Sequence, residues 1–153
     1  MIRTRTDGFS LIELMIVVGL IAVLGGIAVP QVAAGMRQYS LMTASQQVAS
    51  TIRAARAQAV GRNVSLRVRF NFPAAGQYQV WRLDPLLGWV AAGGANIMPN
   101  GASFGAVSGD IQITTAGRVV DPVSGLPTTR TIVVTNGNNR TITVSPSGRV
   151  QLP

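Results

Sequence analysis

The acidic side chains are few and lie far apart in the sequence. The chain of 153 residues contains neither Cys nor His, and its five carboxylates are Asp7, Glu13, Asp84, Asp110 and Asp121. His is the commonest general base and a frequent metal ligand, and clustered carboxylates are the usual alternative for acid–base chemistry or metal binding. Because no two of these acids are close neighbours, the sequence predicts no catalytic residue, no metal site and no cofactor. We therefore expect a protein that is not an enzyme.

One carboxylate, Glu13, lies inside an apolar run that extends from Phe9 to Val29. At about 1.5 Å per residue, a helix of this length spans about 31 Å, which is the thickness of a bilayer core. A carboxylate at the centre of a bilayer costs about 2.5–3.5 kcal/mol on insertion scales, and less near the interface. No Lys or Arg in the same segment can offset that cost. The sequence therefore predicts that Glu13 has a partner outside its own helix.

The flanking charges indicate how the segment at residues 9–29 crosses a membrane. Arg3 and Arg5 precede it within a short polar leader, residues 1–8, and the next basic residue is Arg37. The positive-inside rule then places the N-terminus in the cytoplasm and the rest of the chain outside. A secretory signal peptide is the competing interpretation, but its apolar region is shorter and precedes a small-x-small cleavage site. We expect a single-pass membrane protein.

Helical periodicity continues over residues 30–61, with Pro30 expected to kink the helix rather than end it and Gly61 expected to stop it. This second half is amphipathic and needs a surface to pack on, because apolar side chains recur along one face at Val32, Met36 and Tyr39 and again at Val48, Ile52, Ala55 and Ala59.

Residues 62–153 have the pattern of a β-rich domain. Residues 64–70 alternate apolar side chains with Ser and Arg, as a half-buried strand does. The Asn136–Asn139 turn predicts a hairpin, and Pro122–Thr129 a surface loop. Further strands are predicted at Gln77–Leu83, Asp110–Thr115, Arg130–Thr135, Arg140–Ser145 and Arg149–Leu152. The predicted fold class is α+β: a long N-terminal helix packed on an antiparallel β-sheet or β-sandwich.

All thirteen basic residues are Arg, and the formal charge is +8. A domain this basic attracts polyanions such as nucleic acid or anionic lipid. In the C-terminal half, the candidates for phosphate contacts are Arg118, Arg130, Arg140 and Arg149, provided that they share one surface. The alternative is a compositional preference for Arg, with these side chains solvated at turns and strand edges.

The N-terminal residues resemble the type IV pilin and pseudopilin superfamily. The match covers residues 5–30 and rests on Gly8, Phe9 and Glu13 in the context GFSLIELMIVV. In that family the Gly precedes a cleavage point, the Phe becomes N-methylated and the Glu is the fifth mature residue. The resemblance implies that a prepilin peptidase removes residues 1–8 and methylates Phe9. In a filament of parallel, staggered helices, the Glu13 carboxylate could then reach the new Phe9 amine of a neighbouring subunit.

The C-terminal half is similar to the GspH/FimT group of minor pseudopilins, through RAARAQAV at residues 53–60 and RTITVSPSGRVQL at residues 140–152. This resemblance implies a structural subunit that helps to initiate or cap the filament of a type II secretion system or a type IV pilus. The implied partners are other pilins or pseudopilins, the prepilin peptidase and the assembly platform of the bacterial inner membrane. The globular domain would lie in the periplasm or outside the cell.

The alternative function is DNA binding by a minor pilin during natural transformation. Some FimT-like proteins are thought to bind DNA through a C-terminal Gly-Arg-x-Arg element. The corresponding residues here run from Gly148 to Gln151, and only the first Arg of the element, Arg149, is present. We therefore expect only weak, sequence-independent DNA binding.

Overall fold

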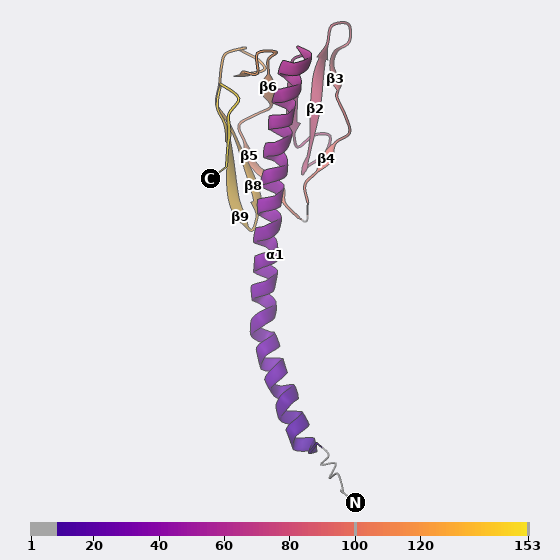
Figure 1. The fold of residues 1–153 in the computed structure, drawn as a ribbon, viewed down its shortest axis with the longest axis vertical. Coiled ribbons are helices and arrows are strands. Elements are labelled where there is room, and N and C mark those ends of the chain that lie inside the picture. Colours follow the sequence, from indigo (N-terminus) through magenta and orange to yellow (C-terminus); the bar gives the residue numbers. More distant parts are fainter. Residues whose placement is uncertain (1–8, 100, 153) are drawn as a thin grey trace, which may run out of the picture. The chain divides into compact units, whose positions relative to one another are not determined.

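The computed structural model describes residues 9–99 and 101–152, so the leader and Gly8 lie outside the described residues. Its helix α1 (Leu11–Arg62) is continuous over 52 residues and contains Pro30 (Figure 1). The predicted continuation of the helix through Pro30 is therefore confirmed. Two compact units divide the chain, one up to Met36 and the other from Arg37 onward.

Helix α1 ends one residue beyond Gly61, which was predicted to stop it. Asn63 adopts a left-handed conformation with φ of 52°. Its N–H donates to the Val60 carbonyl at 3.4 Å, and the Val64 N–H donates to the Ala59 carbonyl at 3.1 Å. These two bonds form a Schellman motif, and Asn is one of the few residues other than Gly that tolerates the left-handed position. The stop signal is therefore Asn63.

The strands form two antiparallel sheets. The first contains β1 (Leu66–Phe70), β2 (Gln77–Asp84), β3 (Gly88–Ala91), β4 (Asn96–Ile97), β6 (Ile111–Ile113) and β7 (Val119–Val120). Its order is β3-β2-β1-β6-β7, and β4 also pairs with β2. The second sheet, in the order β10-β9-β8-β5, contains β5 (Ser103–Val107), β8 (Arg130–Asn136), β9 (Asn138–Val144) and β10 (Val150–Gln151).

The predicted α+β class is confirmed, and so is the hairpin that joins β8 to β9. Asn136 pairs with Asn138 across Gly137, whose φ is 79°. The strands therefore continue further into the turn than the sequence predicts. Four short strands, β3, β4, β5 and β7, were not predicted from the sequence.

The second half of α1 and both sheets enclose one hydrophobic core. The helix face predicted at Val48, Ile52, Ala55 and Ala59 is buried, but Val32, Met36 and Tyr39 are exposed, so the buried face begins at Ser40. Small side chains dominate that face, which lets the helix backbone approach the sheets; the buried positions are Ser40, Leu41, Ala44, Ser45, Val48, Ala49, Ile52, Ala55 and Ala59.

Three aromatic rings join the two sheets at the centre of the core. The Phe104 ring of β5 contacts Phe70 and Tyr78 of the first sheet edge-on, with centroids 5.3 Å and 5.9 Å away. The Tyr78 side chain is fully buried, and its hydroxyl lies 3.4 Å from Thr51 Oγ1 on α1. Burial raises the pKa of Tyr78. Tyr78, which belongs to the first sheet, thus contacts both the second sheet and the helix.

Candidate functional site

The first turn of α1 positions the residues of the N-terminal motif. The Ser10 carbonyl accepts hydrogen bonds from the N–H groups of Glu13 at 3.1 Å and Leu14 at 3.2 Å, so Ser10 occupies the position that precedes the helix. Ser10 and Glu13 then have the spacing of a capping box, in which a Ser side chain and a Glu or Gln three residues later satisfy free backbone N–H groups. A carboxylate in the first turn also complements the positive end of the helix dipole. Glu13 therefore suits the helix locally, quite apart from any role in assembly.

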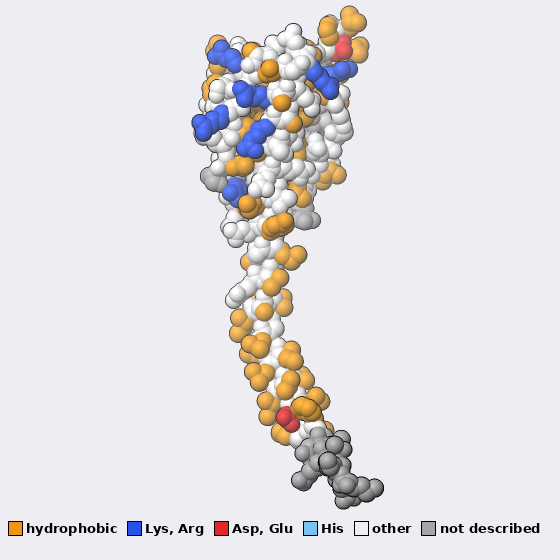
Figure 2. All heavy atoms as spheres, viewed as in Figure 1, with side chains coloured by type: hydrophobic (Ala, Val, Ile, Leu, Met, Phe, Trp, Pro, Cys, Tyr) orange, Lys and Arg blue, Asp and Glu red, His pale blue; other side chains and the backbone are white. Residues whose placement is uncertain are grey.

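The apolar run around Glu13 is exposed along its whole length. Every large apolar side chain from Phe9 to Val29 is at least 44% exposed. By length and composition alone, α1 is the one helix among the described residues that could cross a membrane, and its most apolar window has a mean hydropathy of 2.6. Apolar surface of this extent requires lipid or other apolar helices around it. Figure 2 shows apolar side chains (orange) along this part of the helix, with acidic side-chain atoms (red) among them near its N-terminal end.

Phe9 lies two residues before α1, and Glu13 is the third residue of the helix, so a chain that began at Phe9 would carry its amine just before the helix and a carboxylate in the first turn. Those two groups have opposite charges, and the side chains that flank them in the sequence are mostly apolar. Each can be paired within one chain or between two chains.

Among the described residues, no group of three or more side chains could hold a metal ion.

Of the four arginines proposed for polyanion contacts, Arg130 is the one that the structure corrects. It is only 8% exposed, and its guanidinium donates to the Ser108 carbonyl and to Asp121 Oδ2. Backbone N–H groups of Ser124 and Val123, followed by Arg130, lower the pKa of Asp121 to about 2. Arg130 is thus a structural cation with its own counterion, and it is not available for phosphate contacts.

The remaining three arginines lie at separate positions of the β domain. Arg118 is exposed in the turn between β6 and β7, Arg140 is half-buried on β9, and Arg149 is exposed just before β10. Sequence reasoning missed that Arg149 shares a groove with Arg53 of α1, and that Arg53 and Arg56 line a second groove beside Gly148. Figure 2 shows arginine side chains gathered on this face of the β domain.

The two helix arginines of these grooves also bind the backbone of the β domain. Arg56 Nε donates to the Gly117 carbonyl at 3.0 Å, and Arg53 Nη2 donates to the Val150 carbonyl at 3.5 Å. They therefore tie α1 to the β6–β7 turn and to β10. The prediction that the Gly148–Gln151 element binds DNA only weakly stays a prediction.

A long N-terminal helix that is apolar and exposed in its first half, and packed on antiparallel sheets in its second half, defines a pilin-like subunit. Residues 3–29 match the prokaryotic N-terminal methylation motif, and residues 44–148 match the family model of the type II transport protein GspH. The chain therefore belongs to the GspH family. This confirms the predicted family and the predicted role of a minor pseudopilin or minor pilin.

Solved structures of other proteins share this fold. The type IV minor pilin FimU of Pseudomonas aeruginosa strain PAO1 is 18% identical, with a TM-score of 0.56 over 76% of this chain and 90% of that one. The minor pseudopilin EpsH from the type 2 secretion system of Vibrio cholerae is 12% identical, with a TM-score of 0.59 over 74% of this chain and 96% of that one. No curated protein matches the sequence. At these identities the structures establish the fold alone.

Proposed function

We propose that this protein, after removal of residues 1–8 and methylation of Phe9 by a prepilin peptidase, helps to initiate or cap the filament of a type II secretion system or a type IV pilus. The observation that carries the proposal is Glu13, a charged residue within an exposed apolar helix and four residues after Phe9. Before assembly, the segment at residues 9–29 anchors the chain in the inner membrane. Its N-terminus lies in the cytoplasm and its β domain in the periplasm.

Assembly follows from the energetics of the Glu13 charge. In lipid, the carboxylate costs about 2.5–3.5 kcal/mol if it lies at mid-bilayer. In a filament of staggered helices, it meets the Phe9 amine of the neighbouring subunit, and each charge offsets the desolvation of the other. The pair thus favours transfer of the subunit from the membrane, through the inner-membrane assembly platform, to a complex with other pilins or pseudopilins.

Glu13→Gln tests this proposal sharply, because Gln also serves in a capping box but carries no charge. We expect the variant to insert into the membrane as well as the natural chain does. Its assembly should be impaired, because loss of one member of a buried ion pair costs about 3–5 kcal/mol. Glu13→Asp keeps the charge and is the matched control.

Cross-linking can measure assembly directly, because the chain contains no Cys. A cysteine introduced at Ile16 would be its single thiol and could be cross-linked to cysteines in partner pilins. Normal cross-linking of the Gln variant would refute the pairing argument. Mass spectrometry of the same samples should find a chain that begins with N-methyl-Phe9, and an intact Met1 in a host with active prepilin peptidase would refute the processing.

A further inference from the structure

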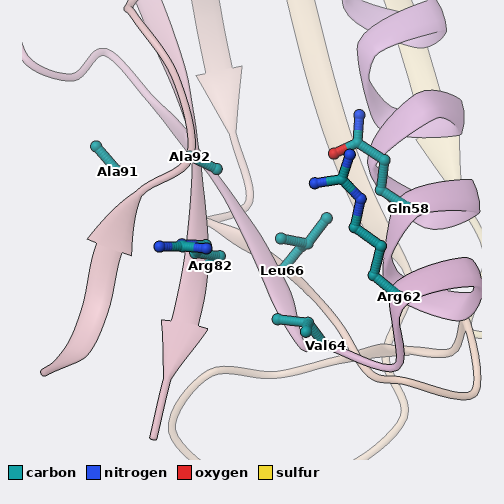
Figure 3. A pocket seen from close by; sticks show the side chains of 7 residues that line it. All are labelled: Gln58, Arg62, Val64, Leu66, Arg82, Ala91 and Ala92. Atoms are coloured by element: carbon teal, nitrogen blue, oxygen red, sulfur yellow. The ribbon is translucent and has the colours of Figure 1, made fainter. Parts of the chain in front are cut away.

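A pocket opens where α1 ends beside the first sheet, and it has a volume of about 280 Å³. Gln58 and Arg62 contribute to it from α1, Leu66 from β1 and Arg82 from β2, and Ala92 follows β3. In Figure 3, Gln58 and Arg62 extend from the helix towards the strands, and Leu66 lies between them and Arg82. The pocket therefore has an apolar centre with an arginine on either side.

The guanidinium groups of both arginines in this pocket are free of hydrogen bonds and ion pairs within the described part of the chain. Among the residues that the structure describes, no acidic side chain lines the pocket. The next acid along β2, Asp84, accepts the N–H groups of Leu86 and Leu87 at 2.9 Å and 3.1 Å. These backbone N–H groups, and to a lesser extent the charge of Arg82, lower the pKa of Asp84. The hydrogen bonds of Asp84 are directed to its own turn, and it forms no ion pair with Arg82 among the described residues.

The fold itself brings the two arginines to this pocket. Arg82 pairs with Leu66 across β1 and β2, and cross-strand partners project from the same face of a sheet, here the face that α1 covers. Arg62 is the last residue of α1, immediately before the left-handed Asn63. Neither position depends on a mobile loop.

The pocket continues into a groove between α1 and β2. Gln58 and Ala92 line both, and the groove extends along small residues that include Ala54, Gly93 and Gly94. Its small side chains leave room for an extended segment of polypeptide, and such a segment could deliver a charged group to the arginines. This continuity favours a protein ligand over a free anion.

We propose that this pocket binds a carboxylate carried on a short aliphatic group of another protein chain. Arginine guanidinium groups bind carboxylates through paired, charge-assisted hydrogen bonds. Leu66 and Ala92 provide apolar surface for the aliphatic part, and Gln58 can donate a further hydrogen bond. The carboxylate belongs either to an Asp or Glu side chain or to a C-terminal residue. This inference does not depend on the pairing of Glu13.

The test uses the full chain in an uncharged detergent and the fluorescence anisotropy of three labelled peptides. The first, Gly-Ser-Gly-Ala-Leu, ends in a free carboxylate, the second is its amide, and the third is an amide with an internal Glu. We expect the free acid or the Glu peptide to bind at least about tenfold more tightly than the neutral amide, as charge-assisted hydrogen bonds to a carboxylate require. Whichever of the two binds identifies the source of the carboxylate.

Substitutions then locate the binding. Arg62→Gln and Arg82→Gln should each weaken it about tenfold, because each removes half of the charge that holds the carboxylate. Arg118→Gln removes an equal charge from an exposed position outside the pocket, and should change binding by less than about twofold. Ala92→Glu, at an exposed position, should also weaken binding by supplying a competing carboxylate.

Three results would overturn the proposal: equal binding of the free acid, the Glu peptide and the neutral amide, no binding at millimolar peptide, or an equal loss in the Arg118 variant. Far-UV circular dichroism verifies that each variant is folded. None of these results bears on Glu13, so the proposed function would stand.

Discussion

Gly148 lies at a point where two turns of the β domain touch. Its φ is 79°, and a Cβ at this position would lie 2.5 Å from the Gly117 carbonyl oxygen and 2.5 Å from Arg56 Nε. A side chain can move away from such a contact, but the backbone of Gly117 cannot move without displacing the β6–β7 turn. Gly148→Ala should therefore destabilise the domain for two separate reasons, namely conformation and steric overlap.

The two contributions can be estimated separately. Placing a residue with a Cβ in the left-handed region costs about 1–2 kcal/mol. Forcing a methyl group into a fully packed site costs about 1–3 kcal/mol more. Gly137→Ala is the matched control, because Gly137 has the same φ of 79° but nothing within 4 Å of its Cβ position. The difference between the two variants should thus be the steric contribution alone.

Urea denaturation of residues 37–153 measures the stability of both variants, because this compact unit contains the whole hydrophobic core. The fluorescence of Trp81 and Trp89 follows unfolding. For a urea m-value of about 1–3 kcal/mol per molar, the steric contribution should lower the midpoint of Gly148→Ala by about 1 M relative to Gly137→Ala. Equal midpoints for the two variants would show that the close approach to Gly117 does not exist.

Two further predictions concern the core and the acid limit of stability. Ile52 is 1% exposed and Val60 is 53% exposed. In the same urea assay, Ile52→Ala should therefore lower the free energy of unfolding by about 2–5 kcal/mol, and Val60→Ala by less than about 0.5 kcal/mol. Similar losses in the two variants would contradict the buried helix face described above. The N–H groups of Ser124 and Val123, followed by Arg130, hold the pKa of Asp121 at about 2 in the folded protein, whereas an unfolded Asp has a pKa of about 3.9. Ionised Asp121 therefore stabilises the fold fully above about pH 3.9, and this contribution is lost as the pH falls towards about 2. Thermal melts from pH 5 to pH 2 should show this loss in the natural protein and a weaker pH dependence in Asp121→Asn.

The parts of the fold that follow local patterns could be predicted from the sequence. Alternation identified β1, β2, β8 and β9, and apolar periodicity identified most of α1. The four strands that were missed are short and lack strong alternation: GWVA, NI, SFGAV and VV. Each of them forms by pairing with a longer strand, as β5 pairs with β8 and β3 pairs with β2. The pairing of β5 with β8 is long-range and has no local signal, whereas β3 pairs with β2 across the short turn between Asp84 and Gly88.

Arg130 shows a different limit of sequence reasoning. The two-residue period of its strand places it on the same face as Ile132 and Val134, so the pattern already indicated burial. What no pattern supplied was Asp121, the counterion that makes the burial of this cation tolerable. The roles of Phe9 and Glu13 come from the N-terminal motif of the sequence, and they stay a prediction.

The continuity of α1 has a mechanical consequence. Because α1 is continuous, a pull on the N-terminal segment reaches the β domain through the helix face that is buried between Ser40 and Ala59. An axial load therefore shears this interface, and many small contacts resist together instead of breaking one after another. Under load, the lifetime of the domain is set by its rate of forced unfolding rather than by its equilibrium stability. Substitutions on this helix face should accordingly weaken the subunit most when it is under tension.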